Sequence, residues 1–441
     1  MGSRIPKEEI GNRNNPQSEI GNPQSNGRVG YLELLRSNRD FRNLWLGQVV
    51  SELGDWFSII ALFNLLLQLT NRAQSVGWFL IIIHLPSVIV GPVAGLLIDR
   101  LDRKRLMIWM DALRAVLVLG YLLVHQAHQI WIVYLTATLE VAILTVFEPA
   151  RTALVPSICR PRELVAANAI SSATWSAMLT IGAAVGGFVA AIFGRQVCYV
   201  LNSVSFVISA LFISRVSNPT RPGVAERRPA TGMGFVQATT RDLQDGFRYL
   251  MAHPPVLALL LVKMGWGLGG GILLVLSVFG EKIFPVMGSG AAGIGVLYAS
   301  RGFGTALGPI AARRLAGERP ASMRNAIAVG FFMGSLFYLS FGQAPRLPLA
   351  ALALIFAHMG GSVTWVFSTV MLQLEVPDEF RGRVFAAEFA LLTLGIALSN
   401  YFTGYWLDVV GFSPRTVASL LGIYFALPGV VWIAAQRVFR K

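Results

Sequence analysis

Apolar residues run in long, almost uninterrupted stretches through most of the chain, and short polar segments rich in arginine separate them. Each stretch approaches the roughly 20 residues that a helix needs to cross the hydrocarbon of a membrane. The pattern predicts an all-α membrane protein with twelve transmembrane helices, at about 41–70, 75–99, 104–126, 129–151, 163–194, 196–216, 255–284, 288–314, 323–343, 347–375, 379–411 and 414–438.

Composition supports a membrane protein. Of the 441 residues, 54% are hydrophobic and only 14% are charged, whereas soluble domains carry about 25% charged residues. The net charge of +14 does not indicate nucleic-acid binding, because the cations lie between apolar spans rather than on one face. The two cysteines, Cys159 and Cys198, are expected at opposite faces of the membrane, and the sequence shows no metal-ligand spacing and no cofactor motif.

The distribution of positive charge predicts the orientation. With the N-terminal tail set aside, 25 Lys and Arg residues fall on one side of the predicted topology, five fall on the other side, and three lie within spans. Cytoplasmic loops of membrane proteins carry the excess of Lys and Arg. We therefore expect a multi-pass protein of the cell (inner) membrane with both termini in the cytoplasm, and we expect it to be a monomer.

Four regions are predicted along the chain. Residues 1–35 are polar and are expected to form a disordered cytoplasmic tail. Residues 36–216 are expected to form one six-helix bundle, and residues 255–441 a second. Between them, 217–254 is predicted to be a cytoplasmic linker, with an amphipathic helix near 241–251 on the membrane surface.

Two short motifs recur in the two predicted bundles at nearly the same offset. Gly91-Pro92 matches Gly308-Pro309, and Leu154-Val155-Pro156 resembles Glu375-Val376-Pro377. Two six-helix halves in the same orientation are typical of transporters built from parallel repeats. The sequence therefore predicts two pseudo-symmetric bundles.

The segment from Gly91 to Arg105, GPVAGLLIDRLDRKR, joins an apolar helix end rich in small residues to an aspartate and a cluster of cations. It resembles the signature loop between helices 2 and 3 of the major facilitator superfamily, although Asp102 takes the place of the usual second glycine. The resemblance covers about 36–440. Within it, Gly54-Asp55-Trp56, Pro86, Asp111, Arg114 and the run Phe147 to Arg151 resemble an exporter branch that includes macrolide-efflux and enterobactin-exporter proteins.

The resemblance implies alternating access, in which two bundles rock about a central site, and a conformational latch made by Gly91, Gly95, Asp99, Arg103 and Glu148. Asp99 is expected to meet the positive N-terminus of the helix that begins near residue 379 and so close the cytoplasmic side. The two glycines would admit that helix, and Arg103 would pair with Glu148. The alternative is that the cations of this segment only anchor the topology.

Three carboxylates of the first predicted bundle fall near the middle of the bilayer: Glu52, Asp55 and Glu140. Ionisable groups inside spans are costly and so indicate function, and burial raises the pKa of a carboxyl group toward neutrality. These residues are candidates for proton coupling. The alternative is a structural role, with Asp55 paired to Arg114.

In the second predicted bundle, Lys263, Arg301, His358 and Glu388 fall at comparable depths. If they converge, the cavity is cationic there and suits an anionic or zwitterionic ligand. An ion pair between Arg301 and Glu388 is the structural alternative. Three aromatic residues are expected to line the same cavity and hold an apolar substrate: Trp56, Trp266 and Trp365.

These features predict a secondary active transporter, a proton-coupled exporter of amphiphilic small molecules of the drug or siderophore class. A lysophospholipid or other lipid translocator is the alternative within transport. A polytopic membrane enzyme is a weaker alternative, because the predicted loops are short and basic and carry no catalytic cluster. The sequence holds no Walker phosphate loop, so ATP does not drive the cycle directly.

Overall fold

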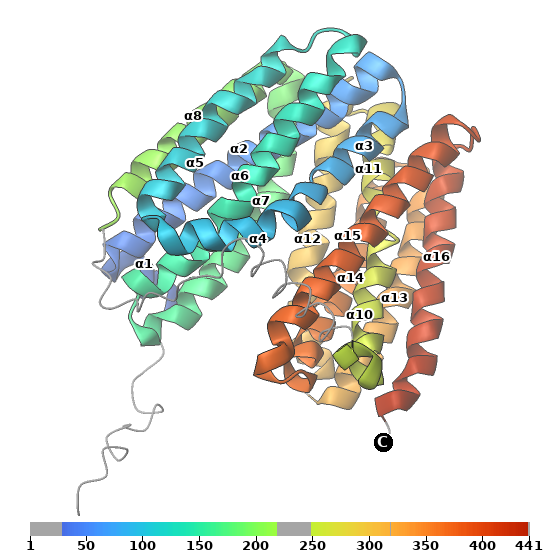
Figure 1. Cartoon of the computed structure of the whole chain (residues 1–441). Coiled ribbons are helices and arrows are strands. Elements are labelled where there is room, and N and C mark those ends of the chain that lie inside the picture. Colours follow the sequence, from blue (N-terminus) through green and yellow to red (C-terminus); the bar gives the residue numbers. More distant parts are fainter. Residues whose placement is uncertain (1–28, 218–247, 318, 440–441) are drawn as a thin grey trace, which may run out of the picture.

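The computed structural model describes residues 29–217, 248–317 and 319–439, and helices dominate throughout (Figure 1). The helices of the first half are α1 (Tyr31–Ser37), α2 (Arg39–Thr70), α3 (Ala73–Ile82), α4 (Leu85–Arg100), α5 (Arg103–Leu117), η1 (Val118–Leu123), η2 (Ala127–Gln129), α6 (Ile130–Ile158), η3 (Pro161–Glu163), α7 (Leu164–Phe193) and α8 (Arg195–Ser214). Those of the second half are α10 (Pro254–Gly267), α11 (Ile272–Lys282), α12 (Gly290–Ala316), α13 (Pro320–Gln343), α14 (Leu347–Glu375), α15 (Asp378–Asp408), α16 (Pro414–Ala435) and η4 (Gln436–Phe439).

Each of the twelve predicted spans corresponds to a helix or to two helices in line. By length and composition, eleven segments of the described chain can cross a membrane. The helix left out of that set is α12, because its many glycines and alanines, together with Arg301, lower its hydropathy. The prediction of an all-α membrane protein is thus confirmed.

Two predicted helices are broken. The second span divides into α3 and α4 at Ile83 and His84, just before Pro86, since proline cannot donate the backbone hydrogen bond that a continuous helix requires. The seventh span divides into α10 and α11 at a turn over 268–271. A side chain at Gly269 would collide with the ring of Phe425, so the turn depends on glycine for its close approach to α16.

The predicted tail and linker lie mostly outside the described residues. The structure nevertheless corrects the end of the tail, because α1 begins within the segment expected to be disordered. Its Leu34 is buried in a hydrophobic cluster with Phe41 and Leu44 of α2, and this packing orders the segment. Of the predicted surface helix, the described residues 248–252 are helical.

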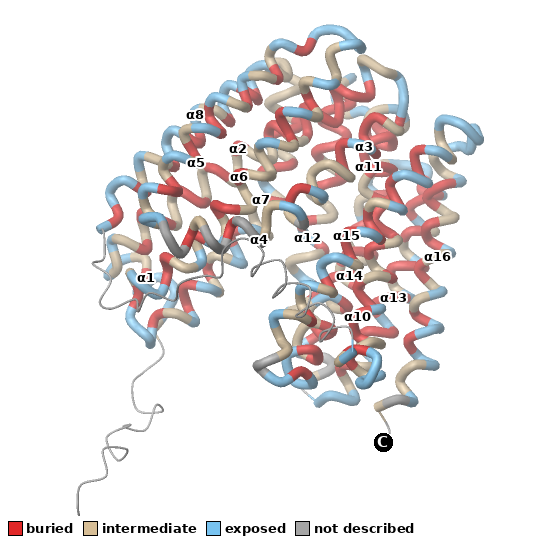
Figure 2. Tube along the Cα trace, in the orientation of Figure 1, coloured by how far each residue is buried: buried red, intermediate tan, exposed pale blue. Residues whose placement is uncertain are grey.

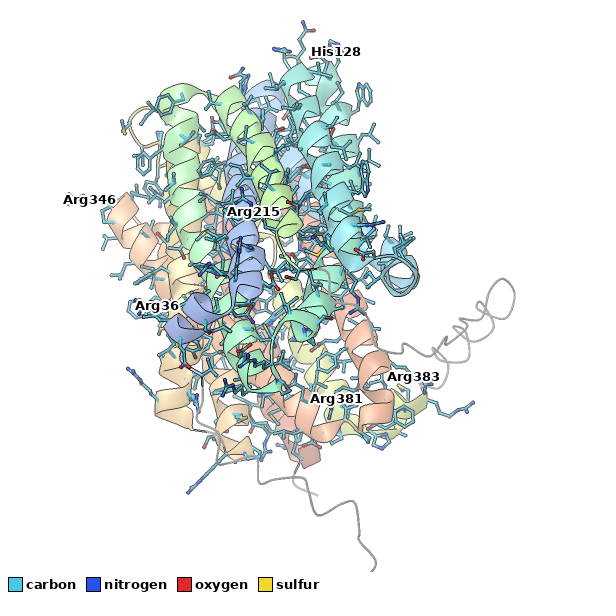
Figure 3. The ribbon with its side chains drawn as sticks, turned by 90° about the vertical axis from the view of Figure 1, so that its left-hand side faces the viewer. Arg36, His128, Arg215, Arg346, Arg381 and Arg383 are labelled. Carbon is cyan, nitrogen blue, oxygen red and sulfur yellow. The ribbon has the colours of Figure 1, made fainter. Side chains whose placement is uncertain are left out.

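The helices form two bundles, α2–α8 and α10–α16, which meet at one end and diverge toward the other (Figure 1). We call the end with loops 71–72, 124–126, 283–289 and 409–413 the closed end, and the end with loops 101–102, 159–160 and 376–377 the open end. The bundles contact each other along α7 with α12 and along α3 with α15, with smaller contacts of α11 to α2 and α3. Figure 3 shows Arg381 and Arg383 toward the open end and His128 at the closed end.

Small residues allow α7 and α12 to pack closely across the bundle boundary. A β-carbon on Gly187 would lie 2.7 Å from the carbonyl oxygen of Ala291 and 2.9 Å from Cα of Gly295. Further along, a β-carbon on Gly302 would lie 2.6 Å from Oγ1 of Thr180. Such contacts drive helix association in lipid, where apolar side chains gain nothing by leaving the solvent.

Burial follows the same division (Figure 2). One hydrophobic core runs through both bundles and includes Phe63, Phe79, Leu274 and Tyr298 near the closed end. A separate core lies at the open end of the first bundle and contains no residue of the second. Large apolar side chains that remain exposed, such as Trp109, lie where lipid would cover them.

The topology makes a labelling prediction. Single cysteines at Met287 (closed end) and Arg105 (open end) should be reached by a membrane-impermeant maleimide from opposite sides of the cell envelope, with only the Met287→Cys variant labelled in intact cells. Native thiols give little background, because both are buried and burial raises the pKa of Cys159 to about 12. Labelling of both variants from one side would contradict the twelve-span arrangement.

Candidate functional site

An ion pair between Asp55 and Arg114 links α2 and α5 in the interior of the first bundle. Both carboxylate oxygens of Asp55, on α2, lie 2.9 Å from Nη2 of Arg114 on α5. Asp111, one turn before Arg114, is 3.9 Å from the other guanidinium nitrogen and is fully buried. The Arg114 guanidinium also lies over the ring of Phe206, 4.0 Å from its centre. The pair of Asp111 with Arg114 is therefore the looser of two, and Asp55 is the principal partner, as the structural alternative for Asp55 expected.

The other two candidates for proton coupling, Glu52 and Glu140, accept hydrogen bonds from neutral groups. Glu140, on α6, accepts one from the hydroxyl of Tyr121, and Glu52 accepts one of 2.8 Å from the amide of Gln48. Glu140 and Asp111 both lie within the electrostatic reach of Arg114. One guanidinium cannot balance the carboxylates of Asp55, Asp111 and Glu140 together, so an uncharged neighbourhood requires protons on two of them.

Asp55 differs from Asp111 and Glu140 because it lines a cavity. Glu52, Trp56 and Arg114 line the same cavity, together with Glu148 and Arg151. The side chain of Asp55 is 28% exposed, whereas that of Arg114 is 4% exposed. Asp55 is thus a carboxylate that solvent protons can reach, joined to an arginine that solvent barely reaches.

A second ion pair lies inside the other bundle. Nζ of Lys263, on α10, is 2.9 Å from Oε1 of Glu388 on α15, and it donates a hydrogen bond of 2.7 Å to Thr369 on α14. The ammonium also lies 4.4 Å from the centre of the Trp365 ring, which packs against Trp266. Four of the predicted cavity residues therefore do come together: Lys263, Trp266, Trp365 and Glu388.

That cluster overturns the structural alternative, an ion pair between Arg301 and Glu388. Glu388 pairs with Lys263 instead. His358 is buried and is hydrogen-bonded to the hydroxyl of Tyr338 at 3.1 Å, which is a packing role. Arg301 lies apart, one turn of α12 from Tyr298, the residue whose ring packs on Trp56 with centroids 6.2 Å apart.

Three residues of the expected latch, Gly91, Arg103 and Glu148, do not make the contacts expected of them in this conformation. A β-carbon on Gly91 would meet no atom within 4 Å, so no helix packs against it. Arg103 donates a hydrogen bond of 2.6 Å to the carbonyl of Ala153, while Glu148 pairs with Arg151, one turn along the same helix, at 2.6 Å. The predicted pair of Arg103 with Glu148 is therefore wrong, although Arg103 still ties α5 to α6. The side chain of Asp99 and the surroundings of Gly95 lie outside the described structure.

Sequence reasoning missed the polar contacts that join the bundles at the closed end. Asp408, the last residue of α15, accepts hydrogen bonds from the backbone nitrogens of Ala73 (2.9 Å) and Gln74 (2.7 Å), the first residues of α3. Glu281 accepts from Asn64 at 2.7 Å, and Lys282 donates to Asn71 at 3.0 Å. A carboxylate at the end of an apolar span was the available signal, since such a group can cap a neighbouring helix.

The model of the Major Facilitator Superfamily matches residues 44–399 of this chain. The chain belongs to that superfamily. Membership makes it a multi-pass membrane transporter of small molecules rather than an enzyme, and it agrees with the helical architecture of the described residues.

Several relatives of this superfamily member carry the names of exporters or efflux proteins. The putative bacilysin exporter BacE of Bacillus subtilis is 22% identical over 377 residues, which cover 84% of this chain and 89% of BacE. Macrolide efflux protein A of Streptococcus pyogenes is 23% identical over 381 residues, which cover 84% of this chain and 90% of that protein. The enterobactin exporter EntS of Escherichia coli O1:K1 is 24% identical over 361 residues, covering 80% and 82%. The resemblance to the exporter branch is confirmed.

Solved structures of the superfamily share the fold. The nucleoside transporter NupG superposes with a TM-score of 0.69 at 14% identity, covering 90% of this chain and 99% of NupG. A bacterial homologue of the human lysosomal transporter Spinster, described as inward-facing and unoccupied, superposes with a TM-score of 0.69 at 16% identity, covering 92% and 98%. At these identities the likeness establishes the fold alone.

Breaking the pair of Lys263 with Glu388 should destabilise the second bundle. The Lys263→Met variant leaves a buried carboxylate without its cation, at a cost of about 3–5 kcal/mol, and the apparent Tm in detergent should fall sharply. The double variant Lys263→Met, Glu388→Leu should recover most of that loss. Arg151→Ala, which breaks an ion pair whose Glu148 is exposed, is the control, with an expected effect of at most about 1 kcal/mol. A double variant as unstable as the single one would show that the pair is not the source of the effect.

Proposed function

We propose that this transporter is a proton-coupled exporter of amphiphilic small molecules that works by alternating access, as a monomer in the cell inner membrane. The observation that carries the proposal is the position of Asp55. This carboxylate reaches a cavity, holds a buried arginine of the neighbouring helix, and immediately precedes Trp56, which packs on the opposite bundle.

The open end is the cytoplasmic end in this proposal. The excess of Lys and Arg in the loops of that end supports the assignment, and it places both termini in the cytoplasm. The described arrangement is then inward-facing, since the bundles share a hydrophobic core near the closed end while the open end of the first bundle has a core of its own. The export direction follows the efflux-type names of the relatives.

Protonation of Asp55 would couple the gradient to the rocking motion. Ionised Asp55 binds Arg114 and so fixes α2 against α5, and a proton on Asp55 removes most of that attraction. The charged or titratable groups around Asp55 are Arg114 and Asp111 on α5, Glu52 one turn earlier on α2, and Glu140 and Glu148 on α6. Because Trp56 is the next residue, a shift of α2 changes its contact with Tyr298 across the bundle boundary.

Two reciprocal latches would alternate between the conformations. α3 is a neighbour of α15, and α4, which follows it, packs on α6. Asp408 ends α15 beside the start of α3, and α4 carries Asp99 in its last turn at the open end, where α15 begins. At the closed end Asp408 caps α3. At the open end, Asp99 would cap α15 once the bundles come together there, which extends the expected latch.

Removing the carboxylate charge at Asp55 should uncouple transport from the proton gradient. The Asp55→Asn variant should lose gradient-driven efflux of a macrolide and dye panel from cells that lack their major efflux pumps, while substrate binding remains measurable. An uncoupler should abolish efflux by the parent chain and change nothing in the variant. Asp111→Asn is the matched control, since it removes a carboxylate beside the same arginine but away from the cavity. Gradient-driven efflux that persists in Asp55→Asn would rule out this residue as the coupling group.

The two latch aspartates should bias the conformation in opposite directions. Spin labels at His128 and Met287 report the closed end, and labels at Arg105 and Arg319 report the open end. Asp408→Asn should lengthen the first distance and shift the population toward outward-facing by about 2- to 30-fold, which corresponds to one interaction of a charge with a helix terminus. Asp99→Asn should favour the described conformation.

Asp102→Asn is the control for both latch variants, because the Asp102 carboxylate caps its own helix, where it accepts a hydrogen bond from the backbone nitrogen of Arg105. Equal shifts in the same direction from Asp408→Asn and Asp99→Asn would refute reciprocal latching.

A further inference from the structure

Arg301 occupies a distinctive position on α12. It lies one turn toward the open end from Tyr298, whose ring packs on Trp56 and on Phe63 of α2, with centroid distances of 6.2 Å and 5.3 Å. The hydroxyl of Tyr298 donates to the carbonyl of Leu273 at 2.9 Å. Tyr298 is thus fixed between the bundles, and Arg301 stands beneath it on the side that faces the open end.

The guanidinium of Arg301 has no acidic partner among the residues that the structure describes. The other two cations inside the spans, Arg114 and Lys263, each hold a carboxylate at 2.9 Å. Within the described chain Arg301 forms no ion pair and no side-chain hydrogen bond, and its Nε atom is buried and unpartnered. The guanidinium carbon lies 5.8 Å from the centre of the Tyr298 ring, within the range of a cation–π contact.

The surroundings of Arg301 are polar but not acidic. Its charge acts on His84, at the break between α3 and α4, and on Tyr338 and His358 of the second bundle. None of these groups supplies a negative charge to balance the guanidinium. Asp55 lies beyond Trp56 and already holds Arg114. A cation at this depth is costly unless an anion accompanies it, and since the described residues supply none, an anionic ligand would lower that cost.

We propose that Arg301 binds the carboxylate of the transported molecule, with Trp56, which lines a cavity, contacting its apolar part. This inference rests on the proposed export function and narrows its substrates to amphiphilic organic anions and zwitterions. Guanidinium presents paired N–H donors whose geometry matches a carboxylate. Arg301 and Trp56 belong to different bundles, and the buried ring of Tyr298 connects them, so a ligand held by both residues touches both halves of the transporter.

The test uses the full chain in nanodiscs of zwitterionic lipid, at equilibrium and without a proton gradient. The probes are dansyl-leucine and dansyl-leucinamide, which share bulk and fluorophore and differ by the carboxylate. The parent chain should bind the acid at least about 10-fold more tightly than the amide, as expected for one charge-assisted hydrogen-bonded pair. Arg301→Gln should bind both equally, and Arg301→Lys should retain part of the preference.

Arg415→Gln is the control, since it removes another arginine of the second bundle, one that donates to the carbonyls of Gly342 and Ala344 at the closed end, and it should keep the full preference for the acid. An unchanged Tm shows that Arg301→Gln is folded. Nanodiscs with phosphatidylglycerol distinguish a lipid headgroup from a free ligand, because competition by that lipid would assign the site to headgroups and overturn the proposal.

Two further outcomes would also overturn it: no preference for the acid in the parent chain, or the same preference in Arg301→Gln. Failure of the export proposal is distinguishable, because binding is measured without a gradient. Loss of proton-driven efflux would leave the difference between acid and amide intact.

Discussion

Hydrocarbon does not solvate charge, and this constraint determines how each bundle is built. Asp55 pairs with Arg114 between α2 and α5, and Lys263 pairs with Glu388 between α10 and α15. Both pairs are internal to a bundle. Each therefore makes its own bundle cohesive without joining it to the other, and separating the bundles breaks neither pair. A protein whose halves must move as units inside lipid needs this arrangement, because exposing half of a buried ion pair at every cycle would be prohibitively costly.

The contacts between the bundles are of a different kind. Along α7 and α12, small residues such as Gly187 and Gly295 allow close packing without polar groups that must be satisfied. At the membrane surface, Asp408 caps α3, and water can replace that contact when it opens. Each of these interactions is individually modest, and lipid or water can take the place of each partner. The contacts across the boundary between the bundles can thus break and form again, whereas the ion pairs inside each bundle stay intact.

Hydropathy and charge, which are local properties of sequence, were enough to predict the spans, their number and the all-helical fold. The broken helices were less accessible, because the turn at 268–271 depends on the ring of Phe425, far away in the chain. The least predictable feature was which charged side chains form ion pairs with each other. Glu388 lay at a similar predicted depth to both Lys263 and Arg301, and only the rotation of each helix about its axis decides between them. The cap of Ala73 by Asp408 joins residues 335 positions apart, and no local pattern records such a contact.

The antiparallel neighbours α3 and α15 give the proposed alternating access a physical basis. A carboxylate stabilises a helix terminus only in contact, within about one turn, so the cap at one face requires the bundles to be close there. Two bundles that tilt against each other about the packed rings of Trp56 and Tyr298 cannot be close at both faces together. In the proposed cycle, a cap by Asp99 at the other face would therefore require release of the Asp408 cap, and the two would have similar strength because they would use the same chemistry. Such a balance leaves the conformational equilibrium sensitive to small inputs at the pivot, which is where Asp55 and Arg301 lie on either side of the rings.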